Sequence, residues 1–306
     1  PPYTCRRQRQ MCIRDSARRF DHDYELVAPL YGLDAGELRQ KDDQQRRPPM
    51  RWFVVAGGEA IGAATIWVRP DDRLFLTFRT TDVRAYAPLT GAIAAAHGRS
   101  IATIVDESDT ERLAALRDDG FEVEEVGERF QVRFSQALPL LRRAWVPTGY
   151  EIRSVVDADE TRAFALDNAI RSLVPGSDGW RGDAELFHEE LDAPEFDAAA
   201  YLIAVEQATD EYAGLLRIWR NRDGPRLGLL GVLPRHRSQP VAAALLARGL
   251  GVAATWGFDS FVTETSPSNH RTHPRLLRMG ASRLGRFFQM TRPGGSGVAG
   301  GAPEAD

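Results

Sequence analysis

The residues with the clearest chemical potential lie at a predicted junction of strand, loop and helix in residues 229–246, LLGVLPRHRSQPVAAALL. The strand ends at Pro234, the loop Arg235–Arg237 is basic, and the helix opens at Pro240, because proline suits the first helical position. The amides at a helix start have no partner inside the helix, and the helix dipole adds positive charge there. Such a junction can bind phosphate or pyrophosphate.

Few side chains are placed to move a proton. Glu264 lies on the predicted strand 260–266, SFVTETS, where alternation puts it on the opposite face from Thr263 and Thr265. We take Glu264 as the candidate base that would activate a nucleophile, and a solvated strand glutamate is the alternative. His236 is expected to be exposed or next to a phosphate. No group of His, Cys and Asp has the spacing of metal ligands, so no metal site is predicted.

These residues are positioned by a predicted α+β unit in the second half of the chain. Its order is a strand, two helices, a three-stranded meander, a helix, a strand, a helix and a strand. The expected segments are 150–156, 158–173, 184–191, 199–233, 240–256, 260–266, 270–279 and 283–292.

The first half repeats this order, and Pro147-Thr148-Gly149 links the halves. We therefore predict two tandem α+β domains, each a mixed, mostly antiparallel sheet flanked by helices. The expected elements of the first half are one or two helices in 20–40, strands 52–58, 60–70 and 73–78, a helix at 85–97, a strand at 101–107, a helix at 109–119 and a closing pair of strands at 121–126 and 129–134.

Composition excludes several classes of protein. Of 306 residues, 43% are hydrophobic and 27% are charged, with a net charge of −4, which is typical of a folded globular chain. No apolar run reaches membrane-spanning length, and a slight acidic excess argues against nucleic-acid binding. Two cysteines, Cys5 and Cys12, give no disulfide framework. We expect a cytoplasmic protein with neither a membrane nor a nucleic-acid partner.

The two ends of the chain are set apart from the predicted domains. Residues 1–16 contain RRQRQMCIRDS, which resembles a translated sequencing adapter and is excluded from fold reasoning. The end, GGSGVAGGAPEAD, has the composition of a flexible linker. The predicted organisation is an adapter-like segment 1–16, an N-terminal domain 17–140, a C-terminal domain 146–292 and a disordered tail 293–306.

The second half resembles the acetyl-CoA motif of the GNAT superfamily of N-acetyltransferases. There a strand ends in Val-x-Pro, an Arg- or Gln-led glycine-rich loop follows, and an apolar helix begins. The later asparagine and glycine of this family fall at Asn269 and Gly280. The residues that carry the first part of the resemblance are Val232-Leu233-Pro234, Arg237 to Ala242 and Ala244-Leu245-Leu246.

The resemblance implies an acyl donor, acetyl-CoA, bound in the second copy. The pantetheine arm would enter between the strand ending at Val232 and the strand at Phe261, and Asn269 would touch it near the thioester. The implied backbone contacts to the arm are Leu230, Gly231 and Val232. The implied pyrophosphate contacts are Arg237, Ser238, Gln239, Pro240, Val241, Ala242 and Ala243.

Some residues depart from the family pattern. Pro240 stands where the family usually has glycine and removes one amide donor. Leu276 stands where a tyrosine often protonates the departing thiolate, and Gly280-Ala281 replaces Gly-Phe. The first half carries a Gly-Phe ending at Phe121 but no cofactor loop, so we interpret it as a degenerate copy.

The expected reaction is direct acyl transfer to a small-molecule or peptide amine, with the active site in the C-terminal copy. A catalytically decayed acyl-CoA-binding regulatory module is the alternative, and a homodimer is one possible assembly. The predicted helices 159–173 and 184–191 would form one wall of the acceptor site. Lining aromatics would be Trp180, Phe187 and Phe196, and Asp183, Glu189 and Glu190 could attract a cationic amine, although core packing and a solvated face are the alternatives.

Overall fold

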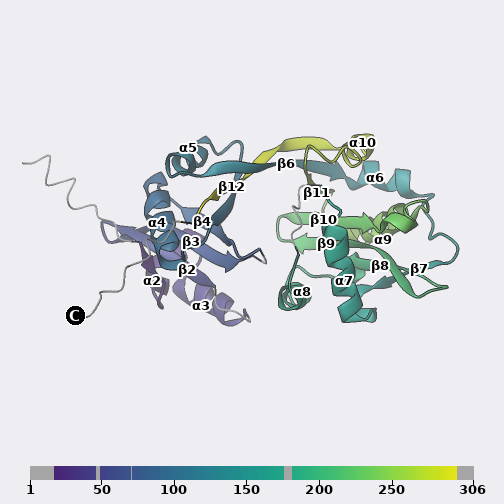
Figure 1. Ribbon diagram of the computed structural model, residues 1–306, viewed down its shortest axis with the longest axis horizontal. Coiled ribbons are helices and arrows are strands. Elements are labelled where there is room, and N and C mark those ends of the chain that lie inside the picture. The colour runs from purple at the N-terminus through teal and green to yellow at the C-terminus, as the bar shows by residue number, and fades with distance from the viewer. Residues whose placement is uncertain (1–16, 46–48, 70, 176–180, 295–306) are drawn as a thin grey trace, which may run out of the picture. The chain divides into compact units, whose positions relative to one another are not determined.

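The computed structural model describes residues 17–45, 49–69, 71–175 and 181–294 (Figure 1). The adapter-like segment 1–16 and residues 295–306 of the predicted tail lie outside this range. The chain divides into two compact units, which are described separately below. Unit 1 contains the residues up to 124 and those from 288 onward, and unit 2 contains residues 125–287. Among the described helices, none is long and apolar enough to cross a membrane.

Unit 1 is an α+β unit with strand order β1-β2-β3-β4-β5-β12, in which β2, β3 and β4 form an antiparallel meander and β4 and β5 run parallel. Leu89 and Ile93 of helix α4 are fully buried in its core with strand residues such as Leu76. Its elements are β1 (Arg18–Arg19), α2 (Tyr24–Val27), the 3-10 helix η1 (Ala28–Tyr31), α3 (Ala35–Asp43), β2 (Met50–Ala56), β3 (Glu59–Val68), β4 (Leu74–Thr80), η2 (Val83–Ala85), α4 (Tyr86–His97), β5 (Ile101–Asp106) and α5 (Thr110–Asp118).

Unit 2 has the same kind of sheet, with strand order β12-β6-β11-β10-β9-β8-β7. β7 to β10 are antiparallel, and β10 and β11 run parallel. The predicted mixed, mostly antiparallel α+β fold is confirmed. The elements are β6 (Glu122–Arg133), α6 (Phe134–Leu141), β7 (Tyr150–Ser154), η3 (Val155–Asp157), α7 (Glu160–Arg171), α8 (Ala184–Leu191), η4 (Ala198–Ala200), β8 (Tyr201–Glu206), β9 (Glu211–Asn221), β10 (Gly224–Val232), η5 (Pro234–His236), α9 (Val241–Ala253), η6 (Ala254–Trp256), β11 (Ser260–Thr265), α10 (His273–Arg278) and β12 (Ser282–Arg292).

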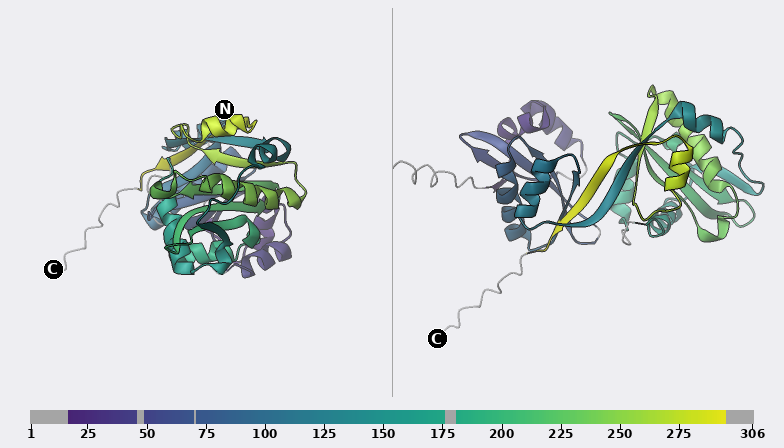
Figure 2. Two further views of the ribbon diagram at one scale, coloured as in Figure 1. Left: turned by 90° about the vertical axis from the view of Figure 1, so that its right-hand side faces the viewer. Right: turned by 90° about the horizontal axis from the view of Figure 1, so that it is seen from above.

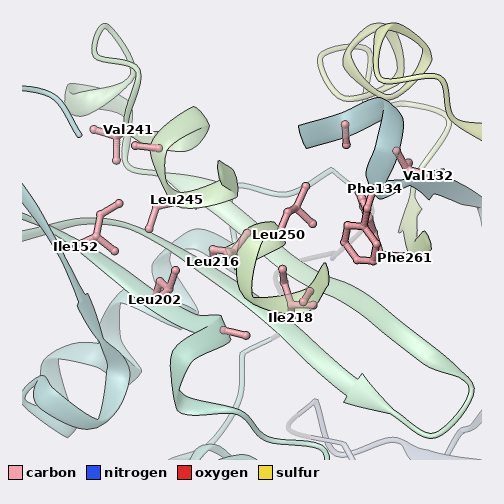
Figure 3. Close-up of a cluster of buried hydrophobic side chains, with 14 of the residues drawn as sticks. Val132, Phe134, Ile152, Leu202, Leu216, Ile218, Val241, Leu245, Leu250 and Phe261 are labelled. Carbon is pink, nitrogen blue, oxygen red and sulfur yellow. The ribbon is translucent and has the colours of Figure 1, made fainter. Parts of the chain in front are cut away.

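Two hydrophobic cores cover the two faces of the unit 2 sheet. On one face, Leu245 and Leu250 of α9 pack near Leu216 and Ile218 of β9, and Phe261 of β11 belongs to the same cluster (Figure 3). On the other face, α7 and α8 pack against β8 and β9 through a second cluster. Burying both faces leaves the ends of the strands as the place where a ligand can reach the sheet.

The closing strand of the first half differs from the prediction. The expected pair 121–126 and 129–134 is one continuous strand, β6. The sequence suggested a turn at Gly127, but this glycine has another role: a Cβ there would lie 2.0 Å from Cζ of Phe287. The glycine gives the ring room to lie against the strand. Helix α6 was not predicted, because Pro139 lies inside it.

The unit boundaries also differ from the predicted domain boundaries at 140 and 146. Residues 128–133 of β6 pair antiparallel with residues 260–265 of β11, so this part of the chain belongs to unit 2 although it precedes the linker at 147–149. In turn, residues 288–292 of β12 belong to unit 1, where Met290 is fully buried. The strands β6 and β12 are neighbours in the sheet (Figure 2).

Candidate active site

The site is built around an opening between β10 and β11. These parallel strands pair only at Arg226 with Val262 and at Leu227 with Thr263, although both strands lie entirely within the described residues and continue further. The Thr263 hydroxyl donates to the Leu227 carbonyl at 3.3 Å, at the point where the strands part. The register of β10 with β9 is broken beside this point by a bulge between Leu227 and Leu229. The predicted opening is therefore present.

The backbone of β10 presents hydrogen-bonding groups to this opening. The Leu233 amide donates to the Ala213 carbonyl at 2.8 Å, so the groups of Leu233 and, by alternation, of Gly231 face β9. The groups of Leu230 and Val232 then face the opposite edge. Of the three predicted backbone contacts, the structure turns Leu230 and Val232 toward the opening and Gly231 away from it.

Gly231 has a packing role instead. A Cβ at this position would lie 2.2 Å from Cγ2 of Ile170, a residue of α7 that is 1% exposed. The absence of a side chain lets α7 lie directly on β10. This places the helix that was predicted as a wall of the acceptor site against the strand that borders the opening.

The loop after β10 leads to an uncapped helix start. Pro240 is the N-cap of α9 and provides no side-chain cap. Among the described residues, the amides of Val241, Ala242 and Ala243 have no acceptor, as expected for the first turn of a helix. Ser238 and Gln239 are exposed in the preceding turn. The predicted pyrophosphate contacts therefore lie together in one segment, in which residues 237–240 are exposed and the side chain of Val241 is buried.

Arg237 is oriented by the strand that it follows. Its Nε donates to the Val232 carbonyl at 2.9 Å. This bond uses one of the two outward carbonyls of the β10 edge, and it leaves the Nη groups of Arg237 without a partner among the described residues. A phosphate bound at the start of α9 could accept hydrogen bonds from them.

The prediction that His236 is exposed or next to a phosphate was wrong. The residue is 4% exposed, and its Nδ1 lies 2.8 Å from the Tyr150 hydroxyl. Burial lowers the pKa of His236, and the opposing effect of Glu206 is smaller. The prediction was wrong because β7 and β10 are distant in sequence, and only the fold brings Tyr150 under the loop. His236 thus connects the loop after β10 to β7 through its contact with Tyr150.

Asn269 lies in the turn that starts α10. Its Oδ1 accepts from the Thr272 amide at 3.3 Å, and its own amide donates to Ser266 at 2.9 Å. The side-chain amide group of Asn269 has no partner among the described residues. Seven residues after Asn269, within α10, Leu276 is buried in the core that includes α9, where the family often has a tyrosine.

Glu264 is held by two arginines. Its carboxylate lies 3.0 Å from Nε of Arg129 and 2.8 Å from Nη2 of Arg226. Burial by itself would raise the pKa of Glu264, but Arg226 and Arg129 outweigh it, and the pKa lies below its ordinary value. A carboxylate with a lowered pKa is a weaker proton acceptor, so this geometry disfavours the role of base.

The acceptor side carries a buried, charge-balanced network. The Tyr201 hydroxyl donates to Asp167 at 2.9 Å, Asp167 pairs with Arg171, and Arg217 pairs with Glu190. Two carboxylates thus face two guanidinium groups, which removes the negative charge expected of Glu190. A cavity of about 10 Å³, the space of one water molecule, is lined by Phe164, Asp167, Arg171, Gly182, Leu186, Phe187 and Glu190.

The other predicted acceptor residues have structural partners. Phe187 is 3% exposed and belongs to the core beneath α7 and α8, with Phe196 packed against the same cluster. Asp183 caps α8, because its Oδ1 accepts from the Leu186 amide at 2.6 Å. Trp180 lies outside the described residues. For Phe187 and Phe196 the structure favours the packing alternative, and Asp183 is an exposed helix cap.

Unit 1 contains the corresponding opening in a filled form. β4 and β5 pair only at Leu74 with Ile101 and at Phe75 with Ala102, and the Thr103 hydroxyl donates to Leu76 at 2.9 Å. The guanidinium of Arg112 donates to Thr103 at 3.1 Å and stacks over the rings of Phe78 and Tyr86. The largest effect on Arg112 is burial, which lowers its pKa.

The helix start of unit 1 is also occupied by the chain itself. The Asp82 side chain accepts from the Arg84 amide at 2.9 Å and forms an ion pair with its guanidinium, which places a carboxylate at the start of the η2–α4 segment. The Arg84 amide therefore already has a carboxylate as its acceptor and is not available to a phosphate. This agrees with the interpretation of the first half as a degenerate copy.

The two threonines at the strand divergence were missed by sequence reasoning. Thr103 and Thr263 each follow two apolar residues at the start of a strand, in IAT and FVT. A comparison of the two halves with one another would have revealed them, since both lie at the same place in the repeated element order. The Tyr150–His236 contact offered no such signal, because it joins segments 86 residues apart.

The fold and the opening together resemble those of solved GNAT proteins. Residues 168–281 match the model of the acetyltransferase (GNAT) family. A comparison of the sequence with curated proteins finds no match.

Solved structures resemble the chain over most of its length. A GCN5-related N-acetyltransferase from Sphaerobacter thermophilus is 18% identical with a TM-score of 0.64, covering 90% of this chain and 95% of that one. A tandem GNAT protein from the clavulanic acid biosynthesis pathway is 15% identical with a TM-score of 0.64, covering 92% and 98%. A GCN5-related N-acetyltransferase from Kribbella flavida is 15% identical with a TM-score of 0.53, covering 85% and 94%. At these identities the likeness establishes the fold.

Proposed function

We propose that this chain is an acetyl-CoA-dependent N-acyltransferase that acts on a small-molecule or peptide amine through unit 2. The observation that carries the proposal is the opening between β10 and β11, which leads directly to the uncapped start of α9. An extended arm can pair with an open strand edge as an added strand, and a pyrophosphate suits a helix start. The family match over residues 168–281 supports the same reading.

The residues present fit such a donor, except that Pro240 lacks an amide hydrogen. The outward amides of Leu230 and Val232 and the outward carbonyl of Leu230 would hold the pantetheine arm. The amides of Val241 to Ala243 and the Nη groups of Arg237 would hold the pyrophosphate. Pro240 supplies no amide, so the loop offers one donor fewer than a glycine-rich loop and would bind the phosphates more weakly.

The transfer itself needs a neutral amine held close to the thioester. The nitrogen attacks the carbonyl carbon, an outward amide of β10 donates to the carbonyl oxygen as negative charge develops, and the C–S bond breaks. Proximity supplies much of the rate. The proton lost by the amine goes to water, because the two arginines on Glu264 make that carboxylate a poor acceptor.

A second function is an acyl-CoA-binding regulatory module that has lost catalysis. Two observations favour it: Leu276 is buried where the family often has a proton-donating tyrosine, and Glu264 is tied up in two ion pairs. Under this alternative the opening and loop still bind the acyl-CoA, but no amine is acylated.

Calorimetric titration with acetyl-CoA, followed by a thiol-release assay over a panel of amines, separates these functions. Thiol release with an amine supports the enzyme, binding without release on any amine supports the module, and no binding overturns both. Leu230→Pro sharpens the result, because it removes an amide that faces the opening and makes no bond to β9. We expect at least about tenfold weaker binding from the loss of one such hydrogen bond, with thermal unfolding as the control for folding.

A further inference from the structure

A buried polar cluster in unit 2 lies beside the end of β11. The carboxylate of Glu128 on β6 is its centre, and the residue is 6% exposed. Nε2 of His273, the first residue of α10, lies 3.2 Å from Glu128 Oε2, and Nη2 of Arg283 lies 2.9 Å from Oε1. None of the interactions described above gives this cluster a function.

Two atoms of the cluster are buried without a hydrogen-bond partner. They are Oγ1 of Thr265 and Nε2 of His273. The contact between His273 and Glu128 is therefore electrostatic and lacks the angle of a hydrogen bond. Buried polar atoms are nearly always paired in folded proteins. His273 Nε2 has the Glu128 carboxylate as its ionic neighbour, so Thr265 Oγ1 is the atom of this cluster that is left for a ligand to contact.

The cluster lies at the level of the sheet where the opening is present. Thr265 is directly paired with Glu128, two residues beyond Thr263, where β10 and β11 part. Paired residues share a face of the sheet. The ring of His273 lies edge-on to Phe130 on the same face, with centroids 5.5 Å apart. The Thr265 hydroxyl and the His273 ring therefore lie on the same face of the sheet, beyond the point where β10 and β11 part.

The orientation of α10 agrees with this placement. Leu276 lies three residues after His273, on the same side of the helix, and is buried in the core with α9. The side of α10 that carries both residues therefore faces the sheet. The aliphatic Leu276 cannot transfer a proton, whereas the imidazole one turn earlier can.

We propose that His273 donates the proton to the sulfur that leaves during acyl transfer, and that Glu128 is the positioning residue for its ring. This inference rests on the proposed function. The C–S bond breaks with its electron pair going to sulfur, and the sulfur takes the proton from Nδ1 of the imidazole. Nε2 stays directed at Glu128. The amine loses its own proton to water, and His273 is reprotonated from water before the next turnover.

The charged groups around His273 are the carboxylate of Glu128 on β6 and two guanidinium groups on β12. Arg283 contacts Glu128 at 2.9 Å, and Nε of Arg286 lies 3.7 Å from it. Both arginines contact the carboxylate oxygen that His273 does not, which leaves Oε2 for the imidazole. Glu128→Gln should therefore weaken the interaction that positions the His273 ring while leaving the imidazole itself in place.

The test uses the full chain and needs no known amine. CoA and desulfo-CoA are bound in turn, and the ultraviolet absorbance of the CoA thiolate is followed as the pH is raised. A proton donor next to sulfur favours its thiolate, so we expect the bound thiol of His273→Ala to ionise about one pH unit higher than that of the wild type, a tenfold loss of thiolate at a given pH. Glu128→Gln should give a smaller shift in the same direction.

His270→Ala is the matched control, because His270 is exposed in the turn before α10 and its side chain makes no hydrogen bond or ion pair among the described residues. It should titrate like the wild type. If His273→Ala fails to fold, His273→Gln decides the matter in its place. Unchanged thiol ionisation in a variant that still binds CoA overturns the role of His273 and leaves the proposed function standing. Failure of the wild type to bind CoA overturns both.

Discussion

Gly231→Ala tests whether the contact of α7 with the open strand β10 depends on a missing side chain. The new Cβ would lie 2.2 Å from Cγ2 of Ile170 and 3.4 Å from its Cβ. Ile170 is 1% exposed, so it has no free space into which to move. Overpacking of this kind costs about 1–3 kcal/mol in the free energy of unfolding. We also expect weaker acetyl-CoA binding, because displacing α7 disturbs the edge formed by Leu230 and Val232.

Urea unfolding measures the stability term, and calorimetric titration with acetyl-CoA measures the binding term. Gly251→Ala is the matched control: a Cβ there meets nothing within 4 Å. Its site lies inside α9, so this change should stabilise the protein by up to about 1 kcal/mol. In the Ile170→Ala background, which lacks Cγ2, the cost of Gly231→Ala should largely vanish. Equal effects of the two glycine changes, or additive effects of Gly231→Ala and Ile170→Ala, would refute the reasoning.

Three further predictions concern charged and titratable groups of unit 2. Arg237→Ala should weaken acetyl-CoA binding by about 1–3 kcal/mol, the range for a lost charge-assisted contact, and an unchanged affinity in calorimetry would mean that the loop is misassigned. Folding lowers the pKa of His236 below its ordinary 6.5, so the unfolded chain binds more protons than the folded protein below that pH. The melting temperature should therefore fall as the pH drops below that value. His236→Gln should reduce this dependence of the melting temperature on pH. The pKa of Glu264 is lowered from its ordinary 4.5, so its ion pairs stabilise the fold above that pH and are lost in acid. Glu264→Gln should lower the free energy of unfolding at neutral pH, measured by urea titration, by about 1–3 kcal/mol.

Local patterns were enough to predict most of the architecture. Alternation on β11 correctly placed Thr263 and Thr265 on one face and Glu264 on the other, and the structure shows that the face with the threonines is the buried one. The meander β8–β9–β10 and the helix after the Val-x-Pro turn followed from hydrophobic runs and turn residues. β6 was misread because a glycine in a strand usually signals a turn or a bulge, whereas Gly127 makes room for a ring from a strand more than 150 residues later.

The candidate site was predictable only as far as its backbone. Strand, loop and helix start are encoded locally, so the loop at 237–243 could be located without the fold. The partners of the charged side chains could not: Glu264 meets Arg129 from β6, and Glu128 meets His273 from α10, and neither pairing has a spacing that sequence periodicity can detect. Side-chain chemistry at this site is decided by tertiary contacts.

The pairing of β6 with β11 joins segments on either side of the linker at 147–149. Residues 128–133 precede the linker, yet they cover the outer edge of β11. A fragment beginning after the linker would expose that edge and invite aggregation. The segment 128–133 is therefore indispensable to unit 2 although it precedes the linker, since it completes the sheet beside β11. Cutting the chain at the linker would therefore separate unit 2 from one of its own strands.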